Sequence, residues 1–105
     1  CFGTDFPVVP ENPFESIYYA MTRKAIGFEN GFNTDMFLDL KTCLKAYTIN
    51  NAYASYEENI KGSIREGKQA DLIVVDRDIF EIQPTEIKNA VVETTFFNGK
   101  IVYSK

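Results

Sequence analysis

The spacing of apolar side chains changes once along the chain, near residue 60. Before that point they recur at the i, i+3, i+4 and i+7 positions of one helix face, namely Phe14, Ile17, Tyr18, Met21 and Ala25. After it they gather in short runs between turn residues, as in Leu72–Val75. Because a helical period does not fit a strand, we predict an α+β chain in which N-terminal helices precede a small, mostly antiparallel sheet.

The start of the first helix is indicated by its capping residues. Asn12 is placed to cap the helix, Pro13 suits its first turn, and Glu15 lies where a capping box requires a carboxylate. The apolar face continues to about Ile26, and Gly27 is placed to end the helix. We therefore predict a helix from Pro13 to Ile26 with one buried face.

Residues 27–39 are rich in glycine, asparagine and aspartate, which predicts a loop. We expect the apolar side chains of this loop to cover another part of the protein: Phe28, Phe32, Met36 and Phe37. Asp39 is placed to cap a second helix, which carries Leu40, Cys43, Leu44 and Tyr47 on one face. A shorter helical stretch is expected over 51–58.

The second half of the chain has the pattern of strands and turns. Leu72–Val75 is a run of four apolar residues between two aspartates, which predicts a buried strand. Pro84 begins a single helical turn that extends to Lys88. Asn98-Gly99 is a strong hairpin signal between β-rich segments at 90–97 and 100–103.

Composition excludes several classes of protein. The chain has no histidine and a net charge of -4 from 11 basic and 15 acidic side chains, without a basic cluster, so nucleic acid is not an expected partner. Cys1 and Cys43 lack metal-binding spacing and do not form a secreted disulfide framework, which favours a reducing compartment. No apolar run is long enough for a membrane helix, and no signal peptide is evident. We therefore expect a cytoplasmic protein without a membrane partner.

Three features carry possible chemistry. Asp5, between Gly3 and Pro7, is either a carboxylate projecting from a strand end or a turn aspartate that bonds its own backbone. Arg23 either binds an anion or acid, or lies on a solvated helix face. The glycine-containing segment 62–68 lacks the spacing of a phosphate-binding loop, so a turn between strands is the favoured interpretation.

Several segments, in order, resemble the C-terminal end of metal-dependent amidohydrolases, most closely the subgroup typified by N-substituted formamide deformylases. They are Gly3-Thr4-Asp5-Phe6-Pro7-Val8, residues 13–23, Ala46-Tyr47-Thr48, residues 51–54, Lys61 to Asp76, and Thr95 to Tyr103. The segment from Lys61 to Asp76 is the most specific, and the resemblance covers almost the whole chain. It implies a C-terminal fragment whose residues 1–60 end a catalytic (β/α)8 barrel and whose residues 61–105 belong to a composite β-sandwich.

The resemblance also implies an activity for the longer parent protein, which is hydrolysis of non-peptide carbon–nitrogen bonds in a small amide-type substrate with a divalent metal, zinc by expectation. Asp5 matches the aspartate that in the family contacts the metal and transfers a proton from water to the leaving group. The histidine ligands of the family would lie before Cys1, so the isolated fragment is expected to hold no metal and to be inactive.

Two interpretations remain open: the tail of a carbon–nitrogen hydrolase, which we favour, and an autonomous non-enzymatic α+β module. In either case we expect a homo-oligomer that buries Phe14, Ile17, Tyr18 and Met21 or pairs edge strands.

Overall fold

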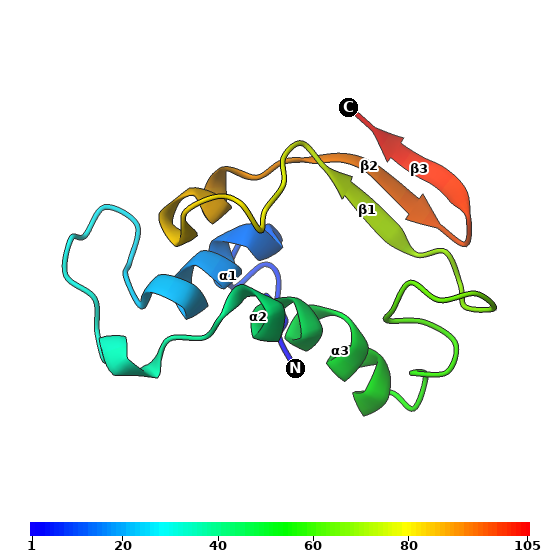
Figure 1. Ribbon diagram of the computed structural model, residues 1–105, viewed down its shortest axis with the longest axis horizontal. Helices are drawn as coiled ribbons and strands as arrows, with labels where there is room; N and C mark the ends of the chain where they lie inside the picture. Colours follow the sequence, from blue (N-terminus) through cyan, green and yellow to red (C-terminus); the bar gives the residue numbers. More distant parts are fainter.

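The computed structural model describes every residue from Cys1 to Lys105, and helices precede strands as predicted (Figure 1). The helices are α1 (Pro13–Thr22), α2 (Leu40–Tyr47) and α3 (Ile49–Ala54), with short 3-10 helices η1 (Thr34–Met36) and η2 (Pro84–Asn89). The strands are β1 (Leu72–Val75), β2 (Val92–Phe97) and β3 (Lys100–Ser104). None of the helices has the length and apolar character needed to span a membrane.

Both predicted helix starts are confirmed by their capping hydrogen bonds. The side-chain oxygen of Asn12 accepts a hydrogen bond from the backbone N–H of Phe14 at 3.0 Å. The Asp39 carboxylate accepts bonds from both the backbone N–H and the hydroxyl of Thr42, at 2.9 and 2.7 Å. The Thr42 side chain and backbone together lower the pKa of Asp39.

The predicted end of α1 is wrong, because the helix stops at Thr22 rather than at Ile26. Arg23 adopts the left-handed backbone conformation, with φ 57°, and its N–H donates to a carbonyl of the last turn. The Thr22 hydroxyl donates to the Tyr18 carbonyl at 2.8 Å and accepts from the Lys24 N–H at 3.2 Å. A non-glycine residue therefore ends this helix, four residues before Gly27.

The boundaries predicted for the third helix, 51–58, are also wrong. It begins at Ile49, directly after α2, and ends at Ala54. Thr48 separates α2 from α3 with φ -120° and ψ -96°, a conformation outside the helical region. Tyr56 has φ 59°, which turns the backbone away before Glu57 and Glu58.

The hydrophobic core lies among α1, α2 and η2. It consists of Phe14, Ile17, Tyr18, Cys43, Ile87 and Ala90. The predicted buried face of α1 is confirmed at Phe14, Ile17 and Tyr18, whereas Met21 is half-buried and Ala25, beyond the helix, is exposed. Phe14, Ile17 and Tyr18 lie in the chain's own core and are not available to a partner. The packing role of Cys43 is confirmed, and its thiol pKa is raised by burial and by the nearby Asp39. The core joins residues from both sides of residue 60, so the two halves of the chain fold against each other.

The sheet has the order β1-β2-β3, and both pairings are antiparallel, as predicted. Asn98 and Gly99 both have positive φ, 49° and 75°, which confirms the tight hairpin turn. The aspartates that flank β1 fasten the sheet at its two ends. The Asp71 carboxylate accepts from the Asn98 N–H at 2.7 Å, and the Asp76 carboxylate accepts from the Val91 N–H at 2.9 Å.

Two burial predictions are wrong. The middle of β1, Ile73 and Val74, is exposed, because no helix or strand of this chain covers that part of the sheet (Figure 1). The apolar side chains of the loop after α1 are also exposed instead of covering another element: Phe28, Phe32, Met36 and Phe37.

Candidate functional site

The chain before α1 is anchored to the helices at Phe2. The Phe2 N–H donates to the Ala46 carbonyl, and the Asn51 side-chain amide donates to the Phe2 carbonyl, both at 2.9 Å. The Phe2 ring also meets the Tyr47 ring edge-on, with 5.5 Å between centroids. These contacts fix where the following residues leave the body of the protein.

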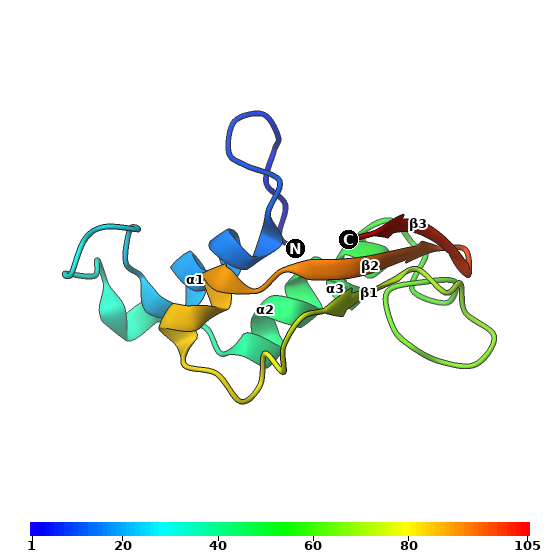
Figure 2. The same ribbon diagram turned by 90° about the horizontal axis from the view of Figure 1, so that it is seen from above.

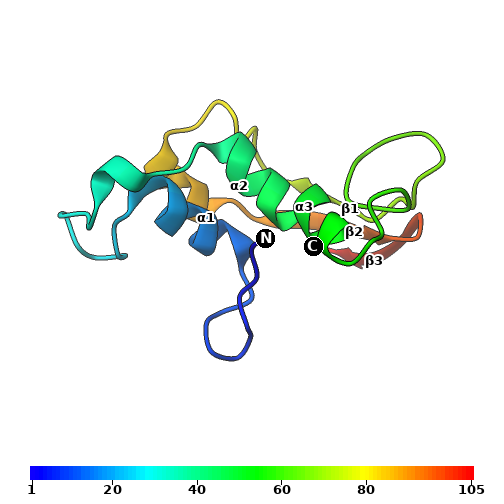
Figure 3. The same cartoon turned by 90° about the horizontal axis from the view of Figure 1, so that it is seen from below.

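Asp5 lies three residues beyond this anchor, at the start of a turn. The segment before α1 that contains this turn projects from the body of the protein (Figures 2 and 3). Its backbone is left-handed, with φ 51°, and its carbonyl accepts from the Val8 N–H at 2.9 Å. The exposed Asp5 carboxylate has no hydrogen-bond partner, so the turn is closed by the main chain alone. Asp5 is therefore a turn residue whose side chain does not bond its own backbone, and no strand of this chain ends before it, so neither predicted interpretation is found in full.

A metal site needs more ligands than this chain brings together. No group of three or more histidine, cysteine, aspartate or glutamate side chains is placed to hold a metal ion. Asp5 alone supplies one carboxylate, whereas a hydrolytic zinc site needs about three protein ligands and an open position. The residues present thus do not fit a complete metal centre.

Arg23 has a role in shaping the loop after α1. Its side-chain Nε donates to the Phe32 carbonyl at 3.3 Å, and the Phe32 N–H donates to the Arg23 carbonyl at 2.9 Å. No carboxylate pairs with Arg23, because the two ion pairs are Lys61–Glu57 and Arg77–Asp76. Arg23 therefore holds the loop closed and does not join Asp5 in a common site.

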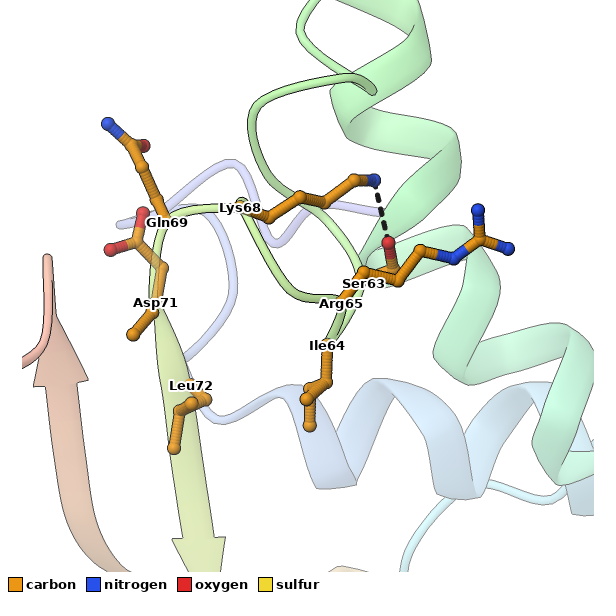
Figure 4. A pocket seen from close by; sticks show the side chains of 8 residues that line it. Ser63, Ile64, Arg65, Lys68, Gln69, Asp71 and Leu72 are labelled. Carbon is orange, nitrogen blue, oxygen red and sulfur yellow. Dashed lines mark hydrogen bonds between the residues drawn. The ribbon is translucent and has the colours of Figure 1, made fainter.

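The segment 62–68 contains turns, as predicted, but it connects α3 to β1 and not two strands. The Lys68 ammonium donates to the Ser63 hydroxyl at 2.7 Å (Figure 4). It also donates to the backbone carbonyls of Glu58 and Lys61. An ammonium group has three N–H donors, so these three oxygens leave none for a phosphate. The adjacent pocket, which Ser63, Lys68 and Asp71 help to line, holds only about 90 Å³.

The largest hollow is an open space of about 1710 Å³ between the α2–α3 layer and the sheet, which we call the groove. Half of its 30 lining residues are hydrophobic, and Asp5 and Arg23 are not among them. Two buried oxygens on groove residues have no hydrogen-bond partner, the Tyr47 hydroxyl and one carboxylate oxygen of Glu58. Asp5 and Arg23 thus lie away from the groove, whereas the segment 62–68 lines part of it.

The sequence analysis included Lys68 only as part of the segment 62–68, and it did not single out Tyr47 or Glu58 as site residues. Tyr47 was expected only on an apolar helix face, where its ring indeed packs. The glycine-containing segment 62–68 indicated a turn, but the convergence of the three acceptors on Lys68 depends on the course of the backbone from residue 58 to 68.

Comparison with known proteins gives a consistent result over the whole chain. Residues 1–103 match the model of the Amidohydrolase family. The chain is 35% identical over 105 residues to YtcJ of Bacillus subtilis (strain 168), which is predicted to be an amidohydrolase; the match covers 98% of this chain and 20% of YtcJ. No solved structure gives a significant match.

Two further relatives have names that state an activity. The chain is 30% identical over 103 residues to the N-substituted formamide deformylase of Arthrobacter pascens, covering 98% of this chain and 19% of that enzyme. It is 29% identical over 114 residues to a 5-methylthioadenosine/S-adenosylhomocysteine deaminase of Caldanaerobacter subterraneus subsp. tengcongensis, covering 98% and 25%. The chain therefore spans about a fifth to a quarter of the length of these relatives.

Proposed function

The chain belongs to the Amidohydrolase family, and from that premise we propose that it forms the C-terminal portion of a hydrolase that cleaves non-peptide carbon–nitrogen bonds. In this proposal residues 1–60 end the catalytic barrel and residues 61–105 form part of a β-sandwich. The substrate is a small molecule of the amide type, as the name of the Arthrobacter pascens relative states for that enzyme.

We assign the acid–base role to Asp5. The observation that carries this assignment is the free Asp5 carboxylate, which is exposed at the head of a turn whose base is fixed by Phe2. In the reaction the carboxylate accepts a proton from water as the water oxygen bonds to the carbonyl carbon. It then donates that proton to the nitrogen as the carbon–nitrogen bond breaks.

Members of this family are generally metal-dependent, and we expect a divalent metal, zinc, in the longer protein. Asp5 would supply one oxygen ligand, and the remaining ligands would come from residues outside Cys1–Lys105.

A chimera tests the proposal. The fifth of the Arthrobacter pascens deformylase that matches this chain is replaced by residues 1–105, and hydrolysis of an N-substituted formamide is measured. We expect the chimera to be active and Asp5→Asn to lower kcat by about 100-fold or more, because general acid–base catalysis typically contributes at least that much.

The control is Asp35→Asn, which changes another exposed aspartate, in η1, and should leave the rate within about 2-fold because surface substitutions away from a site have small effects. Circular dichroism and a thermal melt check that both variants fold. A folded Asp5→Asn chimera with near-normal turnover would show that Asp5 is only a turn residue.

A further inference from the structure

The loop from α3 to β1, residues 55–71, closes around a single ammonium group. The Lys68 side chain donates to the Ser63 hydroxyl at 2.7 Å, as Figure 4 shows, to the Lys61 carbonyl at 3.4 Å, and to the Glu58 carbonyl. We call these three oxygens the cradle. No other basic side chain of the chain is hydrogen-bonded to three oxygens, so the cradle is a special feature of this loop.

All three cradle oxygens are uncharged. Lys68 belongs to neither ion pair of the chain, because Glu57 pairs with Lys61 at 2.8 Å and Asp76 pairs with Arg77. Neutral carbonyl oxygens can replace the hydration shell of a monovalent cation such as K⁺, whereas Ca²⁺ and Mg²⁺ sites include carboxylates. The ligand set of the cradle is therefore that of a monovalent-cation site.

The cradle is held in shape by hydrogen bonds that do not involve the Lys68 ammonium. The N–H groups of Ile60 and Lys61 both donate to the Glu57 carbonyl, at 2.9 and 3.0 Å. The Glu57 N–H in turn donates to the Ala52 carbonyl of α3 at 2.8 Å. Neither cradle carbonyl accepts a hydrogen bond from a backbone N–H, so without the ammonium both would lose their only protein donor.

The ammonium also joins the two arms of the loop, and one of these arms carries the sheet. Besides Lys68, the Gln69 N–H joins the arms by donating to the Ile60 carbonyl at 2.8 Å. The next residue reaches the hairpin, because the Ala70 carbonyl accepts from the Gly99 N–H at 3.1 Å. None of the extensive contacts between elements joins α3 to a strand, so this loop is what connects α3 to the hairpin end of the sheet.

We propose that residues 58–63 form a binding site for a monovalent cation, which the Lys68 ammonium fills, and that this internal cation fixes the hairpin end of the sheet relative to α3. Without the Lys68 side chain, the same oxygens should bind a free ammonium ion. The pocket of about 90 Å³ beside Ser63 gives such an ion access, since one water molecule needs only about 10–15 Å³ of such space. This inference does not depend on the proposed hydrolase activity.

Chemical rescue of Lys68→Ala tests the proposal. Thermal melts of the 105-residue variant and wild type are recorded at neutral pH in ammonium chloride and in tetramethylammonium chloride, both at about 0.5 M so that screening is equal. Tetramethylammonium has the same charge but no N–H donor. The measured quantity is the difference in Tm between variant and wild type in each salt, which removes the effect of the salts on the whole protein.

In tetramethylammonium chloride the variant should melt roughly 5–10 °C below the wild type, because hydrogen bonds to a charged group are lost. Ammonium chloride should restore at least half of this difference. Hydrogen exchange at the Gln69 and Gly99 amides should be at least 10-fold faster in the variant than in the wild type, and ammonium should slow it again.

Arg65→Ala is the matched control. It removes a positive charge from the same loop, but the Arg65 side chain is exposed and forms no ion pair, so its Tm should stay within about 2 °C of the wild type in both salts. Ser63→Ala removes one cradle oxygen and, combined with Lys68→Ala, should abolish most of the recovery in ammonium.

Three results would overturn the proposal. The first is a Tm difference of Lys68→Ala that is equal in the two salts, or a variant that stays unfolded in both, since ammonium would then not occupy the cradle. The second is an equal loss of Tm in Arg65→Ala, which would make the charge of the loop the cause. The third is unchanged exchange at Gln69 and Gly99 in a folded Lys68→Ala chain, because the hairpin end would then be held without the ammonium.

Discussion

Asp76 is the single side chain that closes the end of β1 against the strand beside it. The guanidinium of Arg77 donates two hydrogen bonds to the Asp76 carboxylate, at 2.9 and 2.6 Å, and the Val91 N–H donates a third. The Arg77 bonds, with that of Val91, lower the pKa of Asp76 to about 2. Folding therefore stabilises the charged form of the Asp76 carboxylate relative to the protonated form.

The stability of the chain should therefore fall in acid. The pKa of Asp76 is lower in the folded chain, about 2, than in the unfolded chain, near 4, so its contribution is complete above about pH 4 and is lost as the pH falls through 2. Urea unfolding at pH 7, 4 and 2 measures the free energy of unfolding. Asp76→Asn should reduce the decrease in this free energy between pH 4 and pH 2.

Asp35→Asn is the control, because the Asp35 carboxylate lies exposed in η1 and makes no hydrogen bond. Asp39 and Glu57, whose pKa values are also lowered, leave a residual slope of the same sign. If the Asp76→Asn chain kept the full wild-type slope, the hydrogen bonds at Asp76 would not contribute to stability.

At the scale of elements, the connection from α3 to β1 is a loop that packs on α3 through Gly62. A Cβ at Gly62 would lie 2.7 Å from the Ala52 Cβ and 3.0 Å from the Ile49 Cα, and the residue has φ +85°. Gly67, in the same loop, has nearly the same φ, +86°, but open space around it. A comparison of substitutions at the two glycines therefore distinguishes the cost of backbone strain, which both share, from the cost of close packing, which only Gly62 has.

We expect Gly67→Ala to cost about 1 kcal/mol, because only the left-handed conformation is penalised. Gly62→Ala should cost about 2–4 kcal/mol, since overpacking against α3 adds to the same backbone penalty. Denaturant unfolding of both variants gives the comparison. Equal losses would mean that α3 moves aside freely and that the contact at Gly62 is not restrictive.

Helix starts could be predicted from the sequence, and helix ends could not. Asn12 and Asp39 are recognisable as caps because their short polar side chains bond backbone N–H groups only one turn away. The end of α1 depends on Arg23 and its bonds to Phe32, nine residues later, which no local propensity describes. The exposed middle of β1 was unpredictable for a related reason, because an apolar run does not reveal what covers it.

At the scale of the whole molecule, the chain is an open assembly with one compact end. The core lies among α1, α2 and η2, while the sheet extends away from it (Figure 1). Asp5 is a candidate only through the family motif, and its role stays a prediction. Its surroundings could not be derived, because one carboxylate in a turn does not determine which groups face it.

We expect the 105-residue chain to bind zinc no more tightly than about a millimolar dissociation constant and to hydrolyse no amide, since it offers one candidate ligand where about three are needed. Isothermal titration calorimetry and an amide hydrolysis assay measure these properties. A stoichiometric micromolar zinc site would falsify this expectation.

The composition of the core has a consequence for how the chain is made. Ile17 packs in one cluster with Ile87, which follows it by 70 residues in the sequence. A ribosome that adds about 5–20 residues per second needs roughly 4–14 s to cover that interval. During this time the apolar face of α1 has been synthesised and its partner in η2 has not. The newly made chain therefore leaves the apolar face of α1 without its η2 partner until Ile87 has been added.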